Sequence, residues 1–283
     1  MENIKTIAIA GAGSMGAGIA QVFAQAGYVV RLFDQNTAQL DKAKIDIESN
    51  LSGALTKGKL TAQEKIDTLA KIQYTGDINT LLAEVVIEAI VEKLEVKKEL
   101  FKKIAEINPP TTILASNTSS LSITQIAAGI SNPERVVGMH FFNPAHIMKL
   151  VEVISGAETS PEVTETMKAL TVKIGKTLVV ARDSPGFIVN RVARHYYVES
   201  LMVLEERAAT MENIDALMES AGFRMGPFTL MDTVGNDINF AVTSSLYHSF
   251  HQVAKFRPSR IQQQKVDAGH FGKKTGKGFY NYG

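Results

Sequence analysis

The sequence predicts an α/β protein in which a doubly wound, mostly parallel sheet carries an inserted helical hairpin and is followed by a second, all-helical domain. Short apolar runs alternate with helical patterns from residue 4 to about residue 181, which is typical of strands and helices wound around one sheet. Two charged helical patterns interrupt this alternation between residues 37 and 72, and no comparable strand pattern follows residue 184. We therefore expect domains at residues 1–184 and 185–283.

Composition excludes several classes of function. The chain has 283 residues, of which 45% are hydrophobic, and its formal net charge of +1 gives no electrostatic reason to expect nucleic acid or an anionic membrane as a partner. There are no cysteines, so disulfides, thiolate metal sites and thiol nucleophiles are excluded. Neither a signal peptide nor a run long enough for a membrane span is visible, so we expect a cytoplasmic protein.

The stretch Ile4–Gly16, with the sequence IKTIAIAGAGSMG, predicts a buried strand that leads directly into a glycine-rich turn. The glycines have the spacing Gly11-x-Gly13-x-x-Gly16, and an apolar-faced helix follows over residues 15–26. In this pattern the first glycine permits the turn, the second lets backbone approach a pyrophosphate, and the third lets the helix pack on the strand. The helix N-terminus attracts phosphate, so the pattern predicts a Rossmann-type dinucleotide site.

Asp34 decides which dinucleotide is expected. It ends the second predicted strand, Val29–Phe33, where a carboxylate suits the ribose hydroxyls of NAD and repels the extra phosphate of NADP. Gln35 and Asn36 follow, so no cation stands next to it. We therefore expect NAD as cofactor, and a βαβ unit that binds nothing is the alternative.

The charged region from Thr37 to about Ile72 predicts two helices that separate at Gly58. Thr61 and Glu64 have capping-box spacing for the second helix. The region carries a series of lysines, at positions 42, 44, 57, 59, 65 and 71. They either form a solvated helix surface or meet an anionic, phosphate-bearing part of a substrate.

Further strands are predicted at residues 85–90, 112–115, 136–139, 149–154 and 177–181, with helices at 93–106, 123–130 and 161–174 between them. The strand at 112–115 leads into the polar cluster Ser116-Asn117-Thr118-Ser119-Ser120. Open α/β sheets bind ligands at such strand ends, but the cluster also suits a turn that caps the next helix. Ser119 lacks the glycines of a nucleophile elbow, so we interpret it as a hydrogen-bond donor.

His140 and Glu152 carry the most chemical content. His140 follows the strand at 136–139 and Glu152 lies in the strand at 149–154, so a strand–loop–strand arrangement can bring them together. Histidine can take a hydroxyl proton while a hydride leaves the same carbon, and a carboxylate on its other nitrogen fixes the tautomer. Spacing alone equally allows a buried histidine and an unrelated glutamate. His248 and His251 lack a third ligand, so no metal site is expected.

Several segments together give the chain a resemblance to a known family. They are, in order, GAGSMGAGIA, Asp34, VIEAIVEKLEVKKELF, SNTSSL, GMHFFNP, VEVI, RDSPGFIVNR, GPFTLMD and GKKTGKGFYNY. Over nearly the whole chain they resemble the short-chain L-3-hydroxyacyl-CoA dehydrogenases, above all the bacterial 3-hydroxybutyryl-CoA dehydrogenases. The resemblance implies an NAD-dependent oxidoreductase of fatty acid and butyrate metabolism that reversibly oxidises a short-chain L-3-hydroxyacyl-CoA to the 3-oxoacyl-CoA.

The resemblance also implies roles for individual residues. It makes His140 the general acid/base, Glu152 its partner, and Ser119 and Asn190 contacts of the reacting centre. The implied cofactor-binding residues are Gly11, Gly13, Ser14, Met15, Gly16, Asp34, Glu92, Lys97, Asn117 and Asn143, and those near the CoA are Ser49 and Lys57. The second domain is implied to form a homodimer.

Two other functions stay open. The same architecture would serve a dehydrogenase of a free hydroxy acid or sugar acid, or a non-catalytic NAD-binding protein. The lysines of residues 37–72 favour an acyl-CoA substrate, and the presence of His140, Glu152 and Asn190 favours an enzyme. Acyl chain length, and whether the acyl group is dicarboxylic, are not determined by the sequence.

Overall fold

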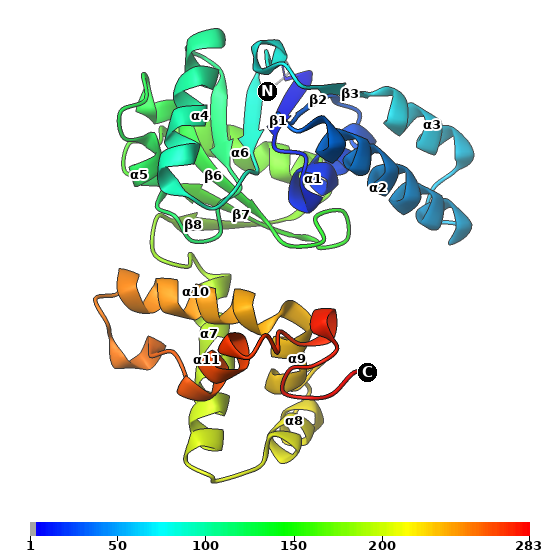
Figure 1. Cartoon of the computed structure of the whole chain (residues 1–283). Coiled ribbons are helices and arrows are strands. Elements are labelled where there is room, and N and C mark those ends of the chain that lie inside the picture. Colours follow the sequence, from blue (N-terminus) through cyan, green and yellow to red (C-terminus); the bar gives the residue numbers. More distant parts are fainter. Residues whose placement is uncertain (1–3) are drawn as a thin grey trace. The chain divides into compact units, whose positions relative to one another are not determined.

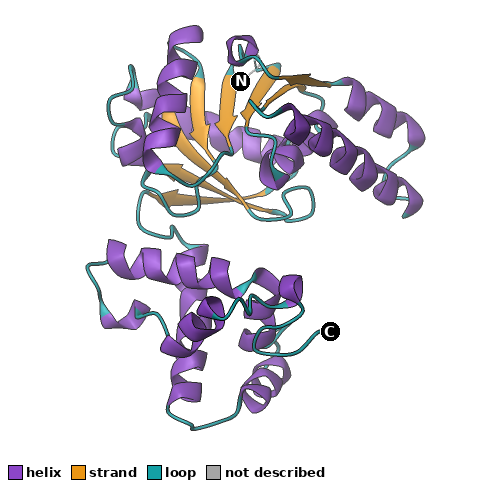
Figure 2. Ribbon diagram, viewed as in Figure 1, coloured by secondary structure: helices purple, strands orange, loops and turns teal. Residues whose placement is uncertain are grey.

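The computed structural model describes residues 4–283. The chain divides into two compact units, of which the first ends at Ser184 and the second begins at Pro185. Figure 1 shows an α/β first unit and a helical second unit, and Figure 2 shows that the strands gather in the first. Within residues 4–283 no helix is both long and apolar enough to cross a membrane.

An eight-stranded sheet forms the centre of the first unit. Its strands are β1 (Thr6–Ala10), β2 (Val29–Phe33), β3 (Ile72–Thr75), β4 (Val85–Glu88), β5 (Ile113–Ser116), β6 (Val136–Phe141), β7 (Leu150–Ser155) and β8 (Thr177–Arg182). They lie in the order β3-β2-β1-β4-β5-β6-β7-β8. Neighbouring strands are parallel except for β6 and β7, which are antiparallel. The predicted doubly wound, mostly parallel sheet is confirmed.

The single change of direction in the sheet follows from a short connection. Residues 142–149 join β6 to β7, and a parallel crossover needs a dozen or more residues. An antiparallel pair is therefore the arrangement that this connection allows. Because β1, β4, β5 and β6 are parallel, they all end at one edge of the sheet. The antiparallel strand β7 begins at this edge.

Helices cover both faces of the sheet (Figure 1). They are α1 (Ser14–Gln25), α2 (Thr37–Thr56), α3 (Ala62–Ala70), α4 (Leu94–Ile107), α5 (Ile123–Ala127) and α6 (Pro161–Lys173). Side chains of α1, α2 and α6 share one core cluster, which includes Phe23, Ile47 and Met167. The helices α4 and α5 contact each other outside that cluster. The layers are those of a doubly wound fold.

The predicted helical hairpin is present as α2 and α3. Thr61 and Glu64 form the predicted capping box, because the Thr61 side chain accepts from the Glu64 N–H and Glu64 accepts from the Thr61 N–H. The helical pattern was expected to reach Ile72, but the chain instead enters β3 there and pairs with β2. β3 has four residues at the edge of the sheet, and of these only Ile72 is buried. So short a strand leaves little apolar pattern in the sequence.

The second unit consists of helices, as predicted. They are α7 (Val189–Glu205), α8 (Met211–Ser220), α9 (Pro227–Val234), α10 (Asn236–Ser249) and α11 (Arg260–Asp267). Their core includes Leu201, Phe228 and Met231. The sequence did not predict α9 and α11, which have eight residues each. Helices of about two turns show little periodicity.

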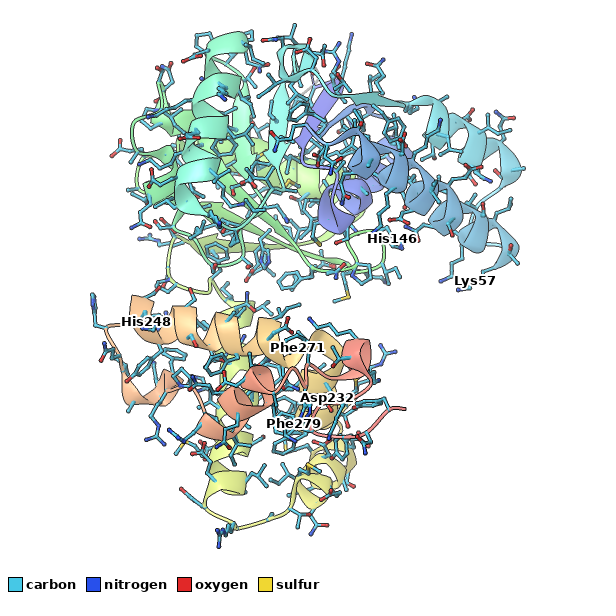
Figure 3. The ribbon with its side chains drawn as sticks, in the orientation of Figure 1. Lys57, His146, Asp232, His248, Phe271 and Phe279 are labelled. Atoms are coloured by element: carbon cyan, nitrogen blue, oxygen red, sulfur yellow. The ribbon has the colours of Figure 1, made fainter. Side chains whose placement is uncertain are left out.

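A buried carboxylate holds the C-terminal segment onto this unit. Asp232 is 1% exposed, and its Oδ1 accepts from the Phe279 N–H at 2.9 Å. Its Oδ2 accepts from the Tyr280 N–H at 2.9 Å and the Tyr282 hydroxyl at 3.1 Å. Figure 3 shows Asp232 beside Phe279. A Cβ on Gly278 would lie 2.1 Å from Asp232 Oδ1, so glycine is required there.

Candidate active site

The glycine turn between β1 and α1 has the geometry that its spacing predicts. A Cβ at Gly11, whose φ is +107°, would lie 2.6 Å from the Ala89 carbonyl oxygen, and one at Gly16 would lie 1.8 Å from the Gly11 oxygen. Neither position therefore admits a side chain. Gly13 caps α1, and nothing lies within 4 Å of the place of its missing Cβ. This open space beside the first residues of the helix, Ser14 and Met15, suits the close approach of a pyrophosphate.

A cavity of about 520 Å³ opens beside this turn and is bounded by Asp34. Asp34 Oδ2 accepts from the Ala12 N–H and Oδ1 from the Asn36 N–H, each at 2.9 Å. These bonds fix the carboxylate at the end of β2. The remaining wall is largely apolar, and it includes Phe33, Ile78, Ile90, Val91, Val96 and Leu100. A carboxylate for ribose hydroxyls beside an apolar wall for a base is what the adenosine half of NAD requires.

His140 and Glu152 face each other across the antiparallel pair of β6 and β7. The distance between His140 Nδ1 and Glu152 Oε2 is 2.8 Å. His140 is 5% exposed and Glu152 is fully buried, and the ring of Phe142 lies 4.4 Å from the imidazole, between centroids. The carboxylate fixes the ring so that Nδ1 carries the proton toward Glu152. Nε2 is then the nitrogen that can exchange a proton with a ligand.

The polar cluster after β5 forms a turn that is held by Glu92. Glu92 Oε1 accepts from the Thr118 hydroxyl at 2.5 Å, from the Ser119 N–H at 3.0 Å and from the Ser120 N–H at 3.2 Å. Glu92 Oε2 lies 3.1 Å from Lys97 Nζ. Burial raises the pKa of Glu92, but Lys97 and the hydrogen bonds of the turn outweigh it, so this pKa lies below its ordinary value.

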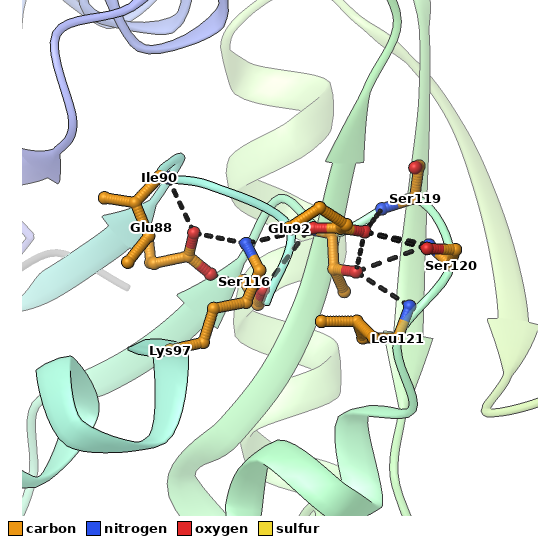
Figure 4. A network of polar contacts seen from close by, with 9 residues as sticks. Glu88, Ile90, Glu92, Lys97, Ser116, Ser119, Ser120 and Leu121 are labelled. Atoms are coloured by element: carbon orange, nitrogen blue, oxygen red, sulfur yellow. Dashed lines mark hydrogen bonds and ion pairs between the residues drawn. The ribbon is translucent and has the colours of Figure 1, made fainter. Parts of the chain in front are cut away.

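Lys97 also contacts a second carboxylate, that of Glu88, which the sequence reasoning missed (Figure 4). Lys97 Nζ lies 2.5 Å from Glu88 Oε1, and the two side chains are 1% and 0% exposed. The Ser116 hydroxyl donates to Glu88 Oε2 at 2.7 Å. The signal available in the sequence was a glutamate within the otherwise apolar strand predicted at residues 85–90; the observed strand β4 ends at this glutamate. A charged residue at the carboxyl end of a buried strand needs partners there.

Asn117 and Asn143 occupy different environments at the same edge of the sheet. Asn117 Oδ1 accepts from the Phe141 N–H at 2.8 Å, and the Asn117 N–H donates to the Glu88 carbonyl at 2.9 Å. Asn117 therefore links the ends of β4, β5 and β6 beside His140. Asn143 lies in the connection between β6 and β7 and is exposed.

The two residues expected near the CoA lie on the hairpin. Ser49 is exposed on α2, and Lys57 is exposed at its C-terminal end, at the outer end of the hairpin in Figure 3. Lys65 instead donates to the Ser52 hydroxyl at 2.9 Å and so joins α3 to α2. Lys65 therefore stabilises the packing of the two hairpin helices, whereas Lys57 is exposed to solvent.

Asn190 lies in the second unit, near the start of α7, and is half-buried. The remaining predicted residues lie in the first unit, and those at the carboxyl ends of its strands gather along one edge of the sheet. Within residues 4–283 no group of three or more His, Asp or Glu side chains is arranged to hold a metal ion.

Sequence models of one family match both units. The model described as "3-hydroxyacyl-CoA dehydrogenase, NAD binding domain" matches residues 6–184, and that described as "3-hydroxyacyl-CoA dehydrogenase, C-terminal domain" matches residues 186–282. The chain thus belongs to the 3-hydroxyacyl-CoA dehydrogenase family, whose members are oxidoreductases with an NAD-binding domain. The family, the enzyme class and the NAD cofactor expected from the sequence are confirmed.

Individual relatives span the whole of this chain. It is 51% identical over 284 residues to the 3-hydroxyadipyl-CoA dehydrogenase of Escherichia coli, covering 100% of this chain and 60% of that longer protein. It is 43% identical over 281 residues to a probable 3-hydroxybutyryl-CoA dehydrogenase of Bacillus subtilis, covering 99% and 98%. The crystal structure of the (S)-3-hydroxybutyryl-CoA dehydrogenase of Ralstonia eutropha matches with a TM-score of 0.96 and 39% identity, covering 99% and 100%.

Proposed function

We propose that this protein reversibly oxidises a short-chain L-3-hydroxyacyl-CoA, such as 3-hydroxybutyryl-CoA, to the 3-oxoacyl-CoA, with His140 as general acid/base. The observation that carries the proposal is the 2.8 Å contact between His140 and the buried Glu152. This pair lies at the same edge of the sheet as the glycine turn, because β1 and β6 run in the same direction. An acid/base pair beside a dinucleotide site is the combination that alcohol oxidation by hydride transfer needs.

His140 moves the proton of the reaction. NAD, when bound, supplies the hydride acceptor. During oxidation His140 Nε2 takes the proton of the C3 hydroxyl, and Glu152 stabilises the imidazolium that forms. During reduction His140 returns this proton to the C3 oxygen. Ser119 and Asn190 are proposed to hold that oxygen by hydrogen bonds.

Two substrate classes are supported by different relatives. The Bacillus subtilis and Ralstonia eutropha proteins carry the name 3-hydroxybutyryl-CoA dehydrogenase, which favours the short acyl chain. The Escherichia coli relative is named for 3-hydroxyadipyl-CoA, a dicarboxylic acyl-CoA, and makes this class the second candidate. Exposed Ser49 and Lys57 on the hairpin suit the phosphate-bearing CoA that both classes share.

We also propose that the second unit forms a homodimer and that the protein works in the cytoplasm without nucleic acid or membrane partners. Apolar side chains on the surface of the second unit support the dimer, among them Leu217, Phe223 and Ile238. Sedimentation at micromolar concentration should give twice the mass of the chain. A stable monomer would contradict this part of the proposal.

The test is NADH oxidation with acetoacetyl-CoA, compared with 3-oxoadipyl-CoA and with free acetoacetate. We expect turnover with a CoA thioester and none with acetoacetate. His140→Gln should lower kcat by about a thousandfold or more, since acid/base catalysis and positioning are lost together. His146→Gln, which alters a half-buried histidine in the connection after β6, is the matched control and should keep kcat. Unchanged turnover in the His140 variant would refute the assignment.

A further inference from the structure

Glu88 is a buried charge to which the proposed reaction gives no role. It ends β4 and is fully buried. Its Oε1 accepts from the Ile90 N–H at 2.7 Å and contacts Lys97 Nζ, and its Oε2 accepts from the Ser116 hydroxyl. A carboxylate that is removed from water this completely is held in one place by its partners, because losing any of them is costly.

Two chains of contacts lead from Glu88 to the turn that carries Ser119. In the first, the Ser116 hydroxyl donates to Glu88 and accepts from the Thr118 N–H at 3.2 Å. In the second, Lys97 joins Glu88 to Glu92, whose Oε1 accepts from the Ser119 N–H. The turn is thus held on one side through Ser116 and on the other through Glu92 (Figure 4).

Lys97 depends on both carboxylates for its place. Its side chain is 1% exposed, so water does not solvate the ammonium, and Glu88 and Glu92 share its charge. Removing the charge of Glu88 would leave Lys97 with the partly exposed Glu92 alone. Glu92 would then be attracted more strongly to Lys97, and its hydrogen bonds with the two N–H groups and two hydroxyls of the turn would change.

We propose that Glu88 is a positioning residue, which holds residues 118–120 so that Ser119 meets the C3 oxygen of the substrate. The inference rests on the proposed function, because Ser119 is assigned its contact there. The bond that ties Ser119 into this network runs through its backbone N–H, so the network sets where the residue stands. A displacement of about 1 Å at a reacting centre costs about a hundredfold in rate.

The test is Glu88→Gln, because glutamine keeps the size of the side chain and one acceptor oxygen but removes the charge. We expect kcat with acetoacetyl-CoA to fall by about 10- to 100-fold. Glu84→Gln is the matched control. Glu84 precedes the same strand at its other end, where it accepts from the Lys5 and Thr6 N–H groups at 3.0 and 2.8 Å, and its variant should keep kcat.

A double-mutant cycle with Ser119→Ala separates positioning from a general loss of structure. If Glu88 acts through Ser119, the double variant loses no more activity than Ser119→Ala alone. Additive losses, or kcat within about twofold of native in Glu88→Gln, would overturn the inference. Ser116→Ala removes only the first chain of contacts and serves as the second variant if Glu88→Gln fails to fold, with the same non-additivity expected.

Failure of the inference can be told from failure of the proposed function. A large loss in Ser119→Ala beside native activity in Glu88→Gln would remove the positioning role and leave the role of Ser119 in place. Native activity in Ser119→Ala would overturn both the proposed contact of Ser119 with the C3 oxygen and the proposed role of Glu88 in positioning Ser119. The His140→Gln result is independent of either outcome.

Discussion

Replacing Lys97 with methionine should be among the most destabilising single changes in the first unit. Methionine matches the length of the lysine stem but removes the cation between Glu88 and Glu92. Glu88 is fully buried, so its charge would lose the partner that compensates for its removal from water. Breaking a buried ion pair from one side costs about 3–5 kcal/mol. With a urea slope of about 3 kcal/mol/M, the unfolding midpoint should fall by about 1 M or more.

The loss of stability in Lys97→Met should depend on pH, and the pKa of Glu92 determines whether this loss grows or shrinks in acid. In the native protein the pKa of Glu92 is lowered, so its contribution to stability is present at neutral pH and is lost as pH falls through that lowered pKa. Without Lys97, its attraction and hydrogen bond no longer lower this pKa, while burial and the hydrogen bonds of the turn remain, so the pKa of Glu92 lies higher in the variant than in the native protein. The native protein therefore loses more of this contribution on acidification than the variant, and the difference in stability between them should narrow between about pH 7.5 and about pH 4.

The assay is urea unfolding followed by far-UV circular dichroism at both pH values. Lys168→Met is the matched control, because Lys168 and Glu165 form a pair on α6 whose side chains are 33% and 69% exposed. Such surface pairs contribute about 0–1 kcal/mol. A loss below about 1 kcal/mol for Lys97→Met, or a gap that widens in acid, would refute the reasoning.

Three further changes probe the dinucleotide turn, the cofactor preference and the C-terminal segment. Gly13→Ala should keep the native Tm but weaken NADH binding about tenfold or more. Gly16→Ala should lower Tm itself, because the added Cβ would lie 1.8 Å from a backbone oxygen, and equal melting temperatures of the two variants would contradict this prediction. Asp34→Ser should shift the ratio of kcat/KM for NADPH over NADH upward by about tenfold or more, and an unchanged ratio would argue against its contact with ribose. Asp232→Asn should lower the free energy of unfolding by about 1–3 kcal/mol and expose the C-terminal lysines to trypsin, because an amide nitrogen cannot accept the N–H hydrogen bonds that Asp232 accepts. Resistance to trypsin equal to that of the native protein would contradict this prediction.

Much of the site could be predicted because its residues follow local patterns. The glycine turn is specified by close contacts that only glycine permits, as at Gly11 and Gly16, and such positions leave a fixed spacing in the sequence. His140 and Glu152 could be paired because a short connection forces their strands to be antiparallel neighbours.

Other parts of the site could not be predicted, because their partners are distant in the chain. In the sequence Glu88 lies inside the strand predicted at residues 85–90, and its contacts with Lys97 and Ser116 arise only when β4, α4 and β5 pack together. Likewise β3 is a strand because β2 offers it an open edge, not because its four residues show a strong pattern.

By itself, the sequence determined the doubly wound sheet, the dinucleotide turn and the helical second unit, since hydrophobic periodicity and glycine spacing are local properties. Only the tertiary structure decided that the glycine- and lysine-rich C-terminal segment, whose composition is typical of a flexible tail, is ordered. Asp232 lies far from it in the chain and accepts its backbone N–H groups in a buried setting. Bonds of this kind replace water only after the chain has folded, and for this reason composition cannot reveal them.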